Sequence, residues 1–308
     1  MWPMSRRRNA KNFRPAQPSH RKEVSHRQET SRRKETSHRK DSLHRKEGSA
    51  PQDMIMGRNC VEEVLKRAPS RLKEVFLAES RDEASASRGN RRAEIREQLL
   101  DLGVSVREVS RRDLDAMVGS DSHQGIVARV SPRVLLELDE LLEEVRSSSH
   151  ISILALDGVL DPQNFGAILR AAECLSVDAV VWSKNRGAPL GPVVSKVSVG
   201  ASELVPLCPV SNLHQALERL KEAGVWTVGA MVAPDAKPLE SFEFPDKSVV
   251  VMGAEGEGVH QLIEKSLDFR VYISMGGSID SLNVSQATAV MLHELAKQRR
   301  QKVSLKVT

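Results

Sequence analysis

The sequence predicts an α/β protein in which a parallel-sheet domain follows a smaller α/β domain. The segment ISILALDGV, which begins at Ile151, is almost continuously apolar, as is typical of a central parallel strand covered on both faces. Beyond it, strand and helix patterns alternate, which favours a parallel sheet with helices on both faces. The chain has 308 residues, 40% of them apolar, which is enough for about two domains. No apolar run approaches the ~18 residues that a membrane-spanning helix needs, so we expect no membrane protein.

Residues 1–52 are predicted to form a disordered, basic arm. From Ser19 a six-residue unit with almost no apolar side chain repeats five times, as SHRKEV, SHRQET, SRRKET, SHRKDS and LHRKEG. Residues 1–50 hold 15 Lys and Arg against 5 Asp and Glu, whereas the rest of the chain holds 31 against 36. Such a segment cannot offset its ordering entropy by burial. It is either an electrostatic tether to RNA or a solvated tail; a mitochondrial transit peptide is disfavoured by the acidic residue in every repeat.

Residues 54–131 are predicted to form the small α/β domain. Gly57 precedes a helical pattern with Val61, Val64 and Leu65 on one side. Three segments have strand character and one is helical, in the order 73–79 (strand), 91–102 (helix), 104–110 (strand) and 125–130 (strand). Pro132 ends this domain, because the residue before a proline avoids the helical region.

Residues 132–150 are predicted to link the two domains. This linker contains an acidic helix whose apolar stripe consists of Leu135, Leu138, Leu141, Leu142 and Val145. The simplest interpretation is a connector that packs against a domain, ended by a flexible joint at Ser147, Ser148 and Ser149.

Residues 151–301 are predicted to form the parallel-sheet domain. After the strand at Ile151, a helix is expected from the spacing of Phe165, Ile168, Leu169 and Ala172. Asn212 or Ser211 can cap a further helix that Gly224 ends. The remaining strands are expected at 179–182, 204–207, 226–231, 248–253 and 271–275, and a last helix at 285–300.

Three polar, glycine-bearing loops follow predicted strands, at 157–170, 253–258 and 276–285. In open α/β sheets, ligands bind at the carboxyl ends of the strands, so these loops are the candidate site. The loop at 253–258 spells neither G-x-G-x-x-G nor a phosphate loop. Without a phosphate cradle, the ligand we expect is an adenosyl cofactor that carries no phosphates and is held by backbone groups and apolar walls.

The three cysteines, Cys60, Cys174 and Cys208, are far apart in the sequence. They exclude a disulfide scaffold and every paired-cysteine zinc motif, and they are typical of a reducing compartment. We therefore expect a cytoplasmic protein without a metal centre. Cys174 and Cys208 have apolar sequence neighbours, which predicts core positions rather than nucleophiles.

The three loops together resemble a known family. DPQNFGAILR (161–170), VMGAEGEG (251–258) and ISMGGSIDSLNVS (273–285) are similar, in order and spacing, to motifs 1, 2 and 3 of the SpoU (TrmH) family. Members of that family are S-adenosylmethionine-dependent RNA ribose 2′-O-methyltransferases. The resemblance extends over residues 54–300. The segments that begin at Gly57, His123 and Gly200 resemble the branch that acts on guanosine in 23S rRNA.

The resemblance implies a SPOUT catalytic domain with a C-terminal trefoil knot, an exception to the rule that chains are un-knotted. It also implies an L30e/L7Ae-like RNA-binding domain at the N-terminal side and a homodimer in which the partner completes each site. For such a dimer we expect the final helix to offer Val284, Met291 and Leu295. The resemblance assigns the S-adenosyl-L-methionine pocket to Gly253, Ile273, Met275 and Leu282. It assigns the catalytic and dimer-organising polar set to Asn164, Arg170, Glu255, Ser281 and Asn283.

These residue types suit methyl transfer, which must align oxygen, methyl and sulfur and stabilise a developing alkoxide, without a metal. Arg170 can grip a phosphate or the oxyanion, Asn164 and Asn283 can orient ribose hydroxyls, and Ser281 can bond cofactor or substrate. Structural roles remain open. Asn164 could cap the helix that contains Arg170, Asn283 could cap the last helix, and Glu255 could pair with an arginine.

The chain departs from the family at Ser274, where the resemblance leads one to expect proline. Loss of the proline frees φ and adds a hydrogen-bond donor, so we expect a less pre-organised loop.

The sequence as a whole predicts a cytoplasmic, homodimeric methyltransferase that modifies the ribose of a guanosine in large-subunit rRNA. A tRNA methyltransferase, a catalytically idle RNA-binding assembly factor and a mitochondrial rRNA methylase are the alternatives. The target nucleotide is not predicted, because base choice depends on loop shape and RNA fold.

Overall fold

The computed structural model describes residues 53–79 and 86–307, which belong to one compact unit of the chain. The basic arm expected at 1–52 lies outside the described residues. Within the described part of the chain, no helix is both long and apolar enough to cross a membrane, and no three His, Cys, Asp or Glu side chains group as metal ligands would.

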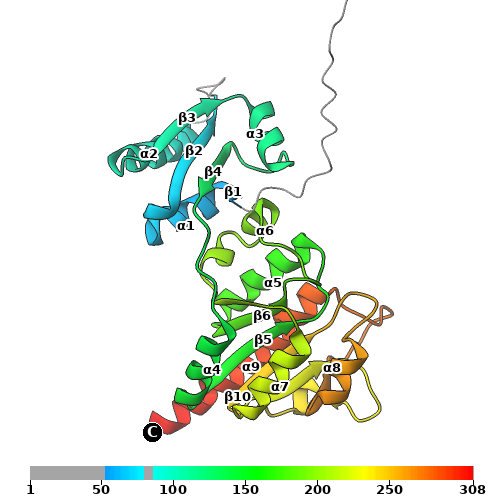
Figure 1. Ribbon diagram of the computed structural model, residues 1–308. Coiled ribbons are helices and arrows are strands. Elements are labelled where there is room, and N and C mark those ends of the chain that lie inside the picture. The colour runs from blue at the N-terminus through cyan, green and yellow to red at the C-terminus, as the bar shows by residue number, and fades with distance from the viewer. Residues whose placement is uncertain (1–52, 80–85, 308) are drawn as a thin grey trace, which may run out of the picture. The chain divides into compact units, whose positions relative to one another are not determined.

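A small four-stranded sheet forms the first module, in the order β1-β4-β2-β3 (Figure 1). Only β2 and β3 pair in parallel; the other neighbours are antiparallel. Helices α1 and α2 pack on one face of the sheet through Val61, Leu65 and Leu99, and α3 covers the other face through Leu114. The bounds are β1 Met54–Met56, α1 Arg58–Arg67, β2 Leu72–Ala78, α2 Ala86–Asp101, β3 Ser105–Val109, α3 Arg111–Val118 and β4 Ile126–Val130.

A seven-stranded, wholly parallel sheet forms the second module, in the order β7-β6-β5-β10-β8-β11-β9. This confirms the predicted α/β fold class. The strands are β5 Ile151–Leu156, β6 Ala179–Ser183, β7 Leu207–Val210, β8 Trp226–Ala230, β9 Lys237–Pro238, β10 Lys247–Met252 and β11 Phe269–Tyr272. The helices are α4 Leu138–Ser147, α5 Pro162–Cys174, α6 Pro192–Val197, α7 Leu213–Glu222, α8 Gln261–Ser266 and α9 Val284–Val307.

Apolar layers cover both faces of this sheet, as the continuous run at Ile151 predicts. Leu154 and Leu156 of β5 join one layer with α5 and α9, while Ile153 and Ala155 join another with α4, α7 and α8. Each fully buried Leu or Ile side chain contributes about 1.5–3 kcal/mol relative to its exposed state. The two layers therefore hold β5 and β10 rigidly at the centre of the sheet.

Four local expectations are wrong. The strand expected at 204–207 begins only at Leu207, because a 3₁₀ turn occupies Ala201–Glu203 and Val180 pairs with Leu207. The acidic helix begins at Leu138 rather than Leu135, because Glu137 and Glu140 form a capping box. The strand expected at 271–275 ends at Tyr272. Cys174 is exposed at the end of α5, whereas Cys208 is buried as expected.

The residues of the last helix that were expected to meet a partner face the protein's own core. Val284, Met291 and Leu295 are all buried in the layer that α9 shares with α5. The sequence pattern identified the apolar stripe of the helix correctly, but it assigned that stripe to the wrong neighbour.

Candidate active site

The polar loops expected at the carboxyl ends of the strands do meet at one edge of the large sheet. They follow β5, β10 and β11, and side-chain hydrogen bonds connect all three. Because parallel strands end at a common edge, residues far apart in the sequence converge there.

Helix α5 positions two of the predicted residues, Asn164 and Arg170. Asp161 caps this helix, since its carboxylate accepts the backbone N–H of Gln163 (3.2 Å) and of Asn164 (3.0 Å), and Pro162 occupies the first helical position. The interpretation of Asn164 as the cap is therefore wrong, and the Asn164 amide is available for other contacts. The buried side of α5 consists of Phe165, Gly166, Ile168, Leu169 and Ala172.

Glu255 joins the three loops through two amides. Nδ2 of Asn164 donates to Glu255 Oε2 at 3.3 Å, and Nδ2 of Asn283 donates to Glu255 Oε1 at 3.3 Å and to Asn164 Oδ1 at 3.0 Å. Within the described residues, Glu255 forms no ion pair with an arginine. We call these three side chains the amide–carboxylate triangle. The triangle thus joins side chains from all three loops by hydrogen bonds.

Asn283 also caps α9, as one alternative expected. Its Oδ1 accepts the backbone N–H of Ser285 at 2.8 Å and the Ser285 hydroxyl at 2.6 Å, and its carbonyl accepts the N–H of Ala287 at 2.9 Å. While Oδ1 is bonded to Ser285, Nδ2 points to Asn164 and Glu255 and donates to both. The structural role and the predicted role are thus compatible in one side chain.

The backbone crosses itself closely at Gly253. A Cβ placed on Gly253 would lie 2.1 Å from the carbonyl carbon of Gly258 and 2.2 Å from the nitrogen of Val259. No side chain fits there. The buried Asp157 also restrains this crossing, because its Oδ2 accepts the N–H of His260, the residue after Val259, at 2.7 Å. Sequence reasoning did not single out Asp157; its signal is an acidic residue directly after a buried strand.

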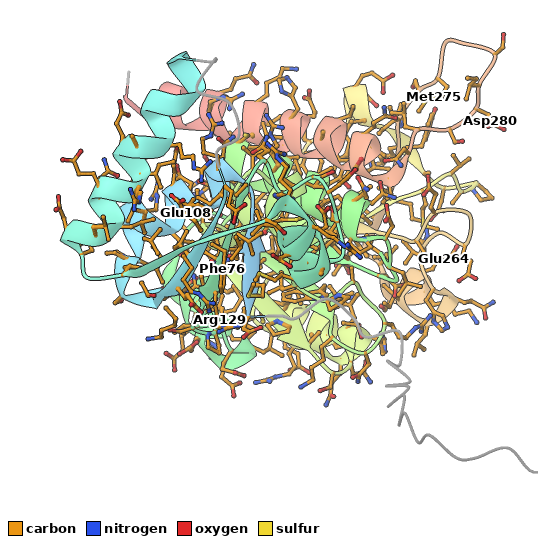
Figure 2. The ribbon with its side chains drawn as sticks, turned by 90° about the horizontal axis from the view of Figure 1, so that it is seen from above. Phe76, Glu108, Arg129, Glu264, Met275 and Asp280 are labelled. Atoms are coloured by element: carbon orange, nitrogen blue, oxygen red, sulfur yellow. The ribbon has the colours of Figure 1, made fainter. Side chains whose placement is uncertain are left out.

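Of the four expected cofactor residues, Gly253 lies at this crossing, and Ile273, Met275 and Leu282 lie on the segment between β11 and α9. Ile273 is half-buried against the core, whereas Met275 and Leu282 expose 38% and 39% of their surface. Figure 2 shows Met275 and Asp280 on an extended loop outside the packed elements. Exposed apolar side chains on this segment, together with the close crossing at Gly253, fit an adenosyl ligand of the S-adenosyl-L-methionine type.

Ser274 gains a partner in place of the missing proline. The Ser274 side chain, and then the backbone of Glu240 itself, hold the pKa of Glu240 below its usual range. Glu240 lies in the 3₁₀ turn Leu239–Ser241, directly after β9, which pairs with β11. Ser274 and Glu240 thus interact at the start of the loop, which the sequence did not reveal.

Arg170 and Ser281 do not join the triangle. Both are exposed, and within the described part of the chain neither side chain has a hydrogen bond or an ion pair. Arg170 lies six residues beyond Asn164, roughly 9 Å along the helix. Both side chains therefore remain available to a ligand.

We predict that Gly253→Ala disrupts the crossing, whereas Gly276→Ala does not. A Cβ at Gly276 would meet nothing within 4 Å, so it is the matched control on the neighbouring loop. Overpacking of this kind costs typically ~1–3 kcal/mol, and we expect a loss of that size in the unfolding free energy of Gly253→Ala. Urea unfolding of both variants measures it. Equal stability of the two would contradict the close approach.

Comparison with solved structures shows the fold. An rRNA methyltransferase from Sinorhizobium meliloti with bound AdoMet superposes with a TM-score of 0.62 over 80% of this chain and 87% of that chain, at 20% identity. An RNA 2′-O ribose methyltransferase gives a TM-score of 0.62 over 80% of this chain and 88% of that chain, at 24% identity.

Comparison of sequences shows the family. The model of the SpoU rRNA Methylase family matches residues 152–293, and a model for RNA 2′-O ribose methyltransferase substrate binding matches residues 54–134. The 23S rRNA (guanosine-2′-O-)-methyltransferase RlmB of Pseudomonas putida is 40% identical over 257 residues, which cover 81% of this chain and 98% of that protein. The RlmB of Escherichia coli K12 is 38% identical over 80% of this chain and 99% of that protein. With both modules matched, and with the motif loops joined by the amide–carboxylate triangle, the chain belongs to the SpoU rRNA methylase family.

Proposed function

We propose that this protein transfers a methyl group from S-adenosyl-L-methionine to the ribose 2′-hydroxyl of a guanosine in large-subunit rRNA. The observation that carries the proposal is the amide–carboxylate triangle, which joins the three motif loops at the ligand-binding edge of the sheet. The choice of rRNA follows the RlmB relatives, which match almost their whole length including the substrate-binding module. Cytoplasmic location stays a prediction.

The cofactor fits the loops on either side of Gly253. When bound, S-adenosyl-L-methionine supplies an electrophilic methyl group on a sulfonium. Gly253 lets two backbone segments approach, and Ile273, Met275 and Leu282 provide apolar walls. The close crossing supports the trefoil knot, which remains a prediction.

The polar residues divide into two groups by their contacts. Asn164, Glu255 and Asn283 bond to one another, and their amides orient the ribose and fix the loops that surround it. Arg170 and Ser281 bond to no described residue and meet the substrate directly. A guanidinium stays protonated in proteins, so Arg170 grips a phosphate and stabilises the forming alkoxide rather than removing the hydroxyl proton.

We further propose a homodimer. The apolar residues first expected to form it are buried in the protein's own core, but others near the site are exposed. Leu160 after β5 exposes 66% of its surface, Ile279 on the loop after β11 exposes 77%, and Val290 on α9 exposes 38%. A partner chain that packs on these three side chains would cover them and would lie next to each active site.

The function is tested by methylation of protein-free 23S-type rRNA with the purified full-length chain and S-adenosyl-L-methionine, followed by mapping of 2′-O-methyl groups. We expect a single guanosine ribose to be modified. Total tRNA serves as the competing substrate. Methylation of tRNA alone would overturn the substrate assignment, and cofactor binding without methylation of either RNA would favour an assembly factor.

We expect Arg170→Lys to keep more activity than Arg170→Ala. Lysine retains the positive charge but loses the planar fork, whereas alanine removes both. Loss of a charge-stabilising donor typically lowers the rate roughly 10²–10³-fold, which we expect for Arg170→Ala in single-turnover assays. Arg219→Ala on α7, where the arginine pairs with Asp139, is the matched control. Equal loss in both Arg170 variants would favour a proton-abstracting role instead.

We expect light scattering at micromolar concentration to give about twice the chain mass of 34.1 kDa. Val290→Glu places a charge among the exposed apolar side chains, so we expect it to shift the measured mass toward that of the monomer. Because Val290 is exposed, we expect the thermal midpoint of the monomer to change little. A fully active wild-type particle of 34.1 kDa would contradict the dimer.

A further inference from the structure

Two of the segments that resemble the 23S rRNA branch, those that begin at Gly57 and His123, come together in the structure at the turn 123–126. The N–H of Gly57 donates to the carbonyl of Ile126 at 3.1 Å, and the N–H of Arg58 donates to Gln124 Oε1 at 3.2 Å. The buried His123 holds this turn, since its Nδ1 accepts the N–H of Gly125 at 2.9 Å while its Nε2 lies 2.9 Å from Asp115. Gln124 thereby accepts a hydrogen bond from the backbone N–H of Arg58, the first residue of α1, and fixes the position of that residue.

Helix α6 of the second module packs on this turn (Figure 1). The N–H of Met56 donates to the Ser195 hydroxyl at 3.3 Å. A Cβ at Gly57, which has φ +91°, would lie 2.7 Å from Cδ and 3.5 Å from Nζ of Lys196. The Lys196 side chain therefore lies directly across Gly57, with its ammonium beside the start of α1.

This arrangement leaves two cations close together without a counter-ion. Arg58 and Lys196 are both half-buried, and within the described residues neither side chain makes a hydrogen bond or an ion pair. Burial first, and then the charge of Arg58, lower the pKa of Lys196.

The neighbouring carboxylates are already paired with other groups. Glu63 pairs with Lys66 and Arg67, and Glu203 with Arg71. Asp115 is held by the His123 ring. These three carboxylates are therefore engaged elsewhere, so an external anion is the group that would relieve the repulsion between the two cations.

We propose that Arg58 and Lys196 together bind a backbone phosphate of the RNA substrate. Arg and Lys are the side chains that bind phosphate oxygens, and such contacts set the position of a nucleic acid without reading its sequence. The inference rests on the proposed function, since it takes RNA as the substrate.

The place of this phosphate site gives it a positioning role. Helix α6 packs closely on α5, because a Cβ at Gly166 would lie 2.8 Å from the Cβ of Val197 and 3.0 Å from the carbonyl of Val194. Helix α5 carries Asn164 and Arg170, so a phosphate held by Lys196 is fixed relative to the active-site edge. The site also joins the substrate-binding module to the catalytic one, and it sets how far the bound RNA extends before it reaches the catalytic loops.

The test compares Arg58→Gln, Lys196→Gln and the double variant with Lys265→Gln, a control that removes one exposed lysine from α8. Figure 1 shows α8 well apart from α6. The probe is protein-free 23S-type rRNA, and its affinity for each protein is measured over a series of KCl concentrations. Loss of each phosphate contact should lower the slope of log K against log salt by roughly 0.7–0.9.

We expect the double variant to bind RNA at least tenfold more weakly, with the methyl-transfer rate recovered at saturating RNA and cofactor affinity unchanged. Lys196→Arg should bind RNA about as tightly as the wild type, because it keeps the positive charge that Lys196→Gln removes. Thermal midpoints of the variants should equal or exceed that of the wild type, since a like-charge repulsion is removed.

Wild-type affinity and salt slope in the double variant would overturn the phosphate site, as would an equal loss in Lys265→Gln. If the wild type methylates its guanosine and only these comparisons fail, the inference alone is wrong. If the wild type methylates no rRNA, the proposed function is wrong, and the binding series still measures the two cations.

Discussion

The candidate site depends on one carboxylate that accepts hydrogen bonds from two amides. Glu255 bonds to Asn164, 91 residues before it, and to Asn283, 28 residues after it. Each of the three loops has its own reason to begin where it does: Asp161 caps α5, Gly253 permits a close crossing, and a strand ends at Tyr272. None of these local features sets the distance between the loops. The amide–carboxylate triangle does so, and it turns three strand ends into one surface of defined shape. Such pre-organisation is what an in-line transfer requires, because reacting atoms must be aligned before the chemical step.

The residues of the site have different structural duties, and their contacts separate them. Asn283 uses its oxygen to start α9 and its nitrogen to hold the triangle, so its amide cannot rotate without loss at one end. Arg170 is exposed on the same helix as Asn164 but takes no part in these bonds. A charged side chain that the fold leaves without a partner is available to a charged ligand. The same reasoning applies at a second place in the fold, where Arg58 and Lys196 both lie beside Gly57. The fold thus bonds the amides that are proposed to orient the ribose to one another, and it leaves the cations that are proposed to bind phosphate without a partner.

Much of the fold could be predicted from the sequence, because long apolar runs and helical spacing are local signals. The strand at Ile151 and the helices at Phe165 and Leu213 are confirmed. Short elements were missed, such as β1 and α3, because three or eight residues carry too little periodicity. The direction of an apolar stripe was not predictable either, as Met291 shows by facing the core. The motif loops were found, but the bonds between them were not. They join side chains up to 119 residues apart, and no local pattern reveals such a distance. The cap of α5 was also not identified: Asn164 was considered as one alternative, whereas Asp161 is the cap.

The central claim is that Asn164 and Asn283 act as one bonded unit, both directly and through Glu255. A double-mutant cycle of Asn164→Ala and Asn283→Ala tests it most directly, with the free energy of unfolding measured in urea for the four proteins. Residues in one hydrogen-bond network show coupling energies of about 0.5–3 kcal/mol, whereas independent sites add to within about 0.3–0.5 kcal/mol. The structure predicts coupling above about 0.5 kcal/mol in the wild-type background. It also predicts that the coupling falls in a Glu255→Ala background, because the bridging acceptor is then absent. Additive losses in both backgrounds would contradict the claim that the triangle holds the three loops together.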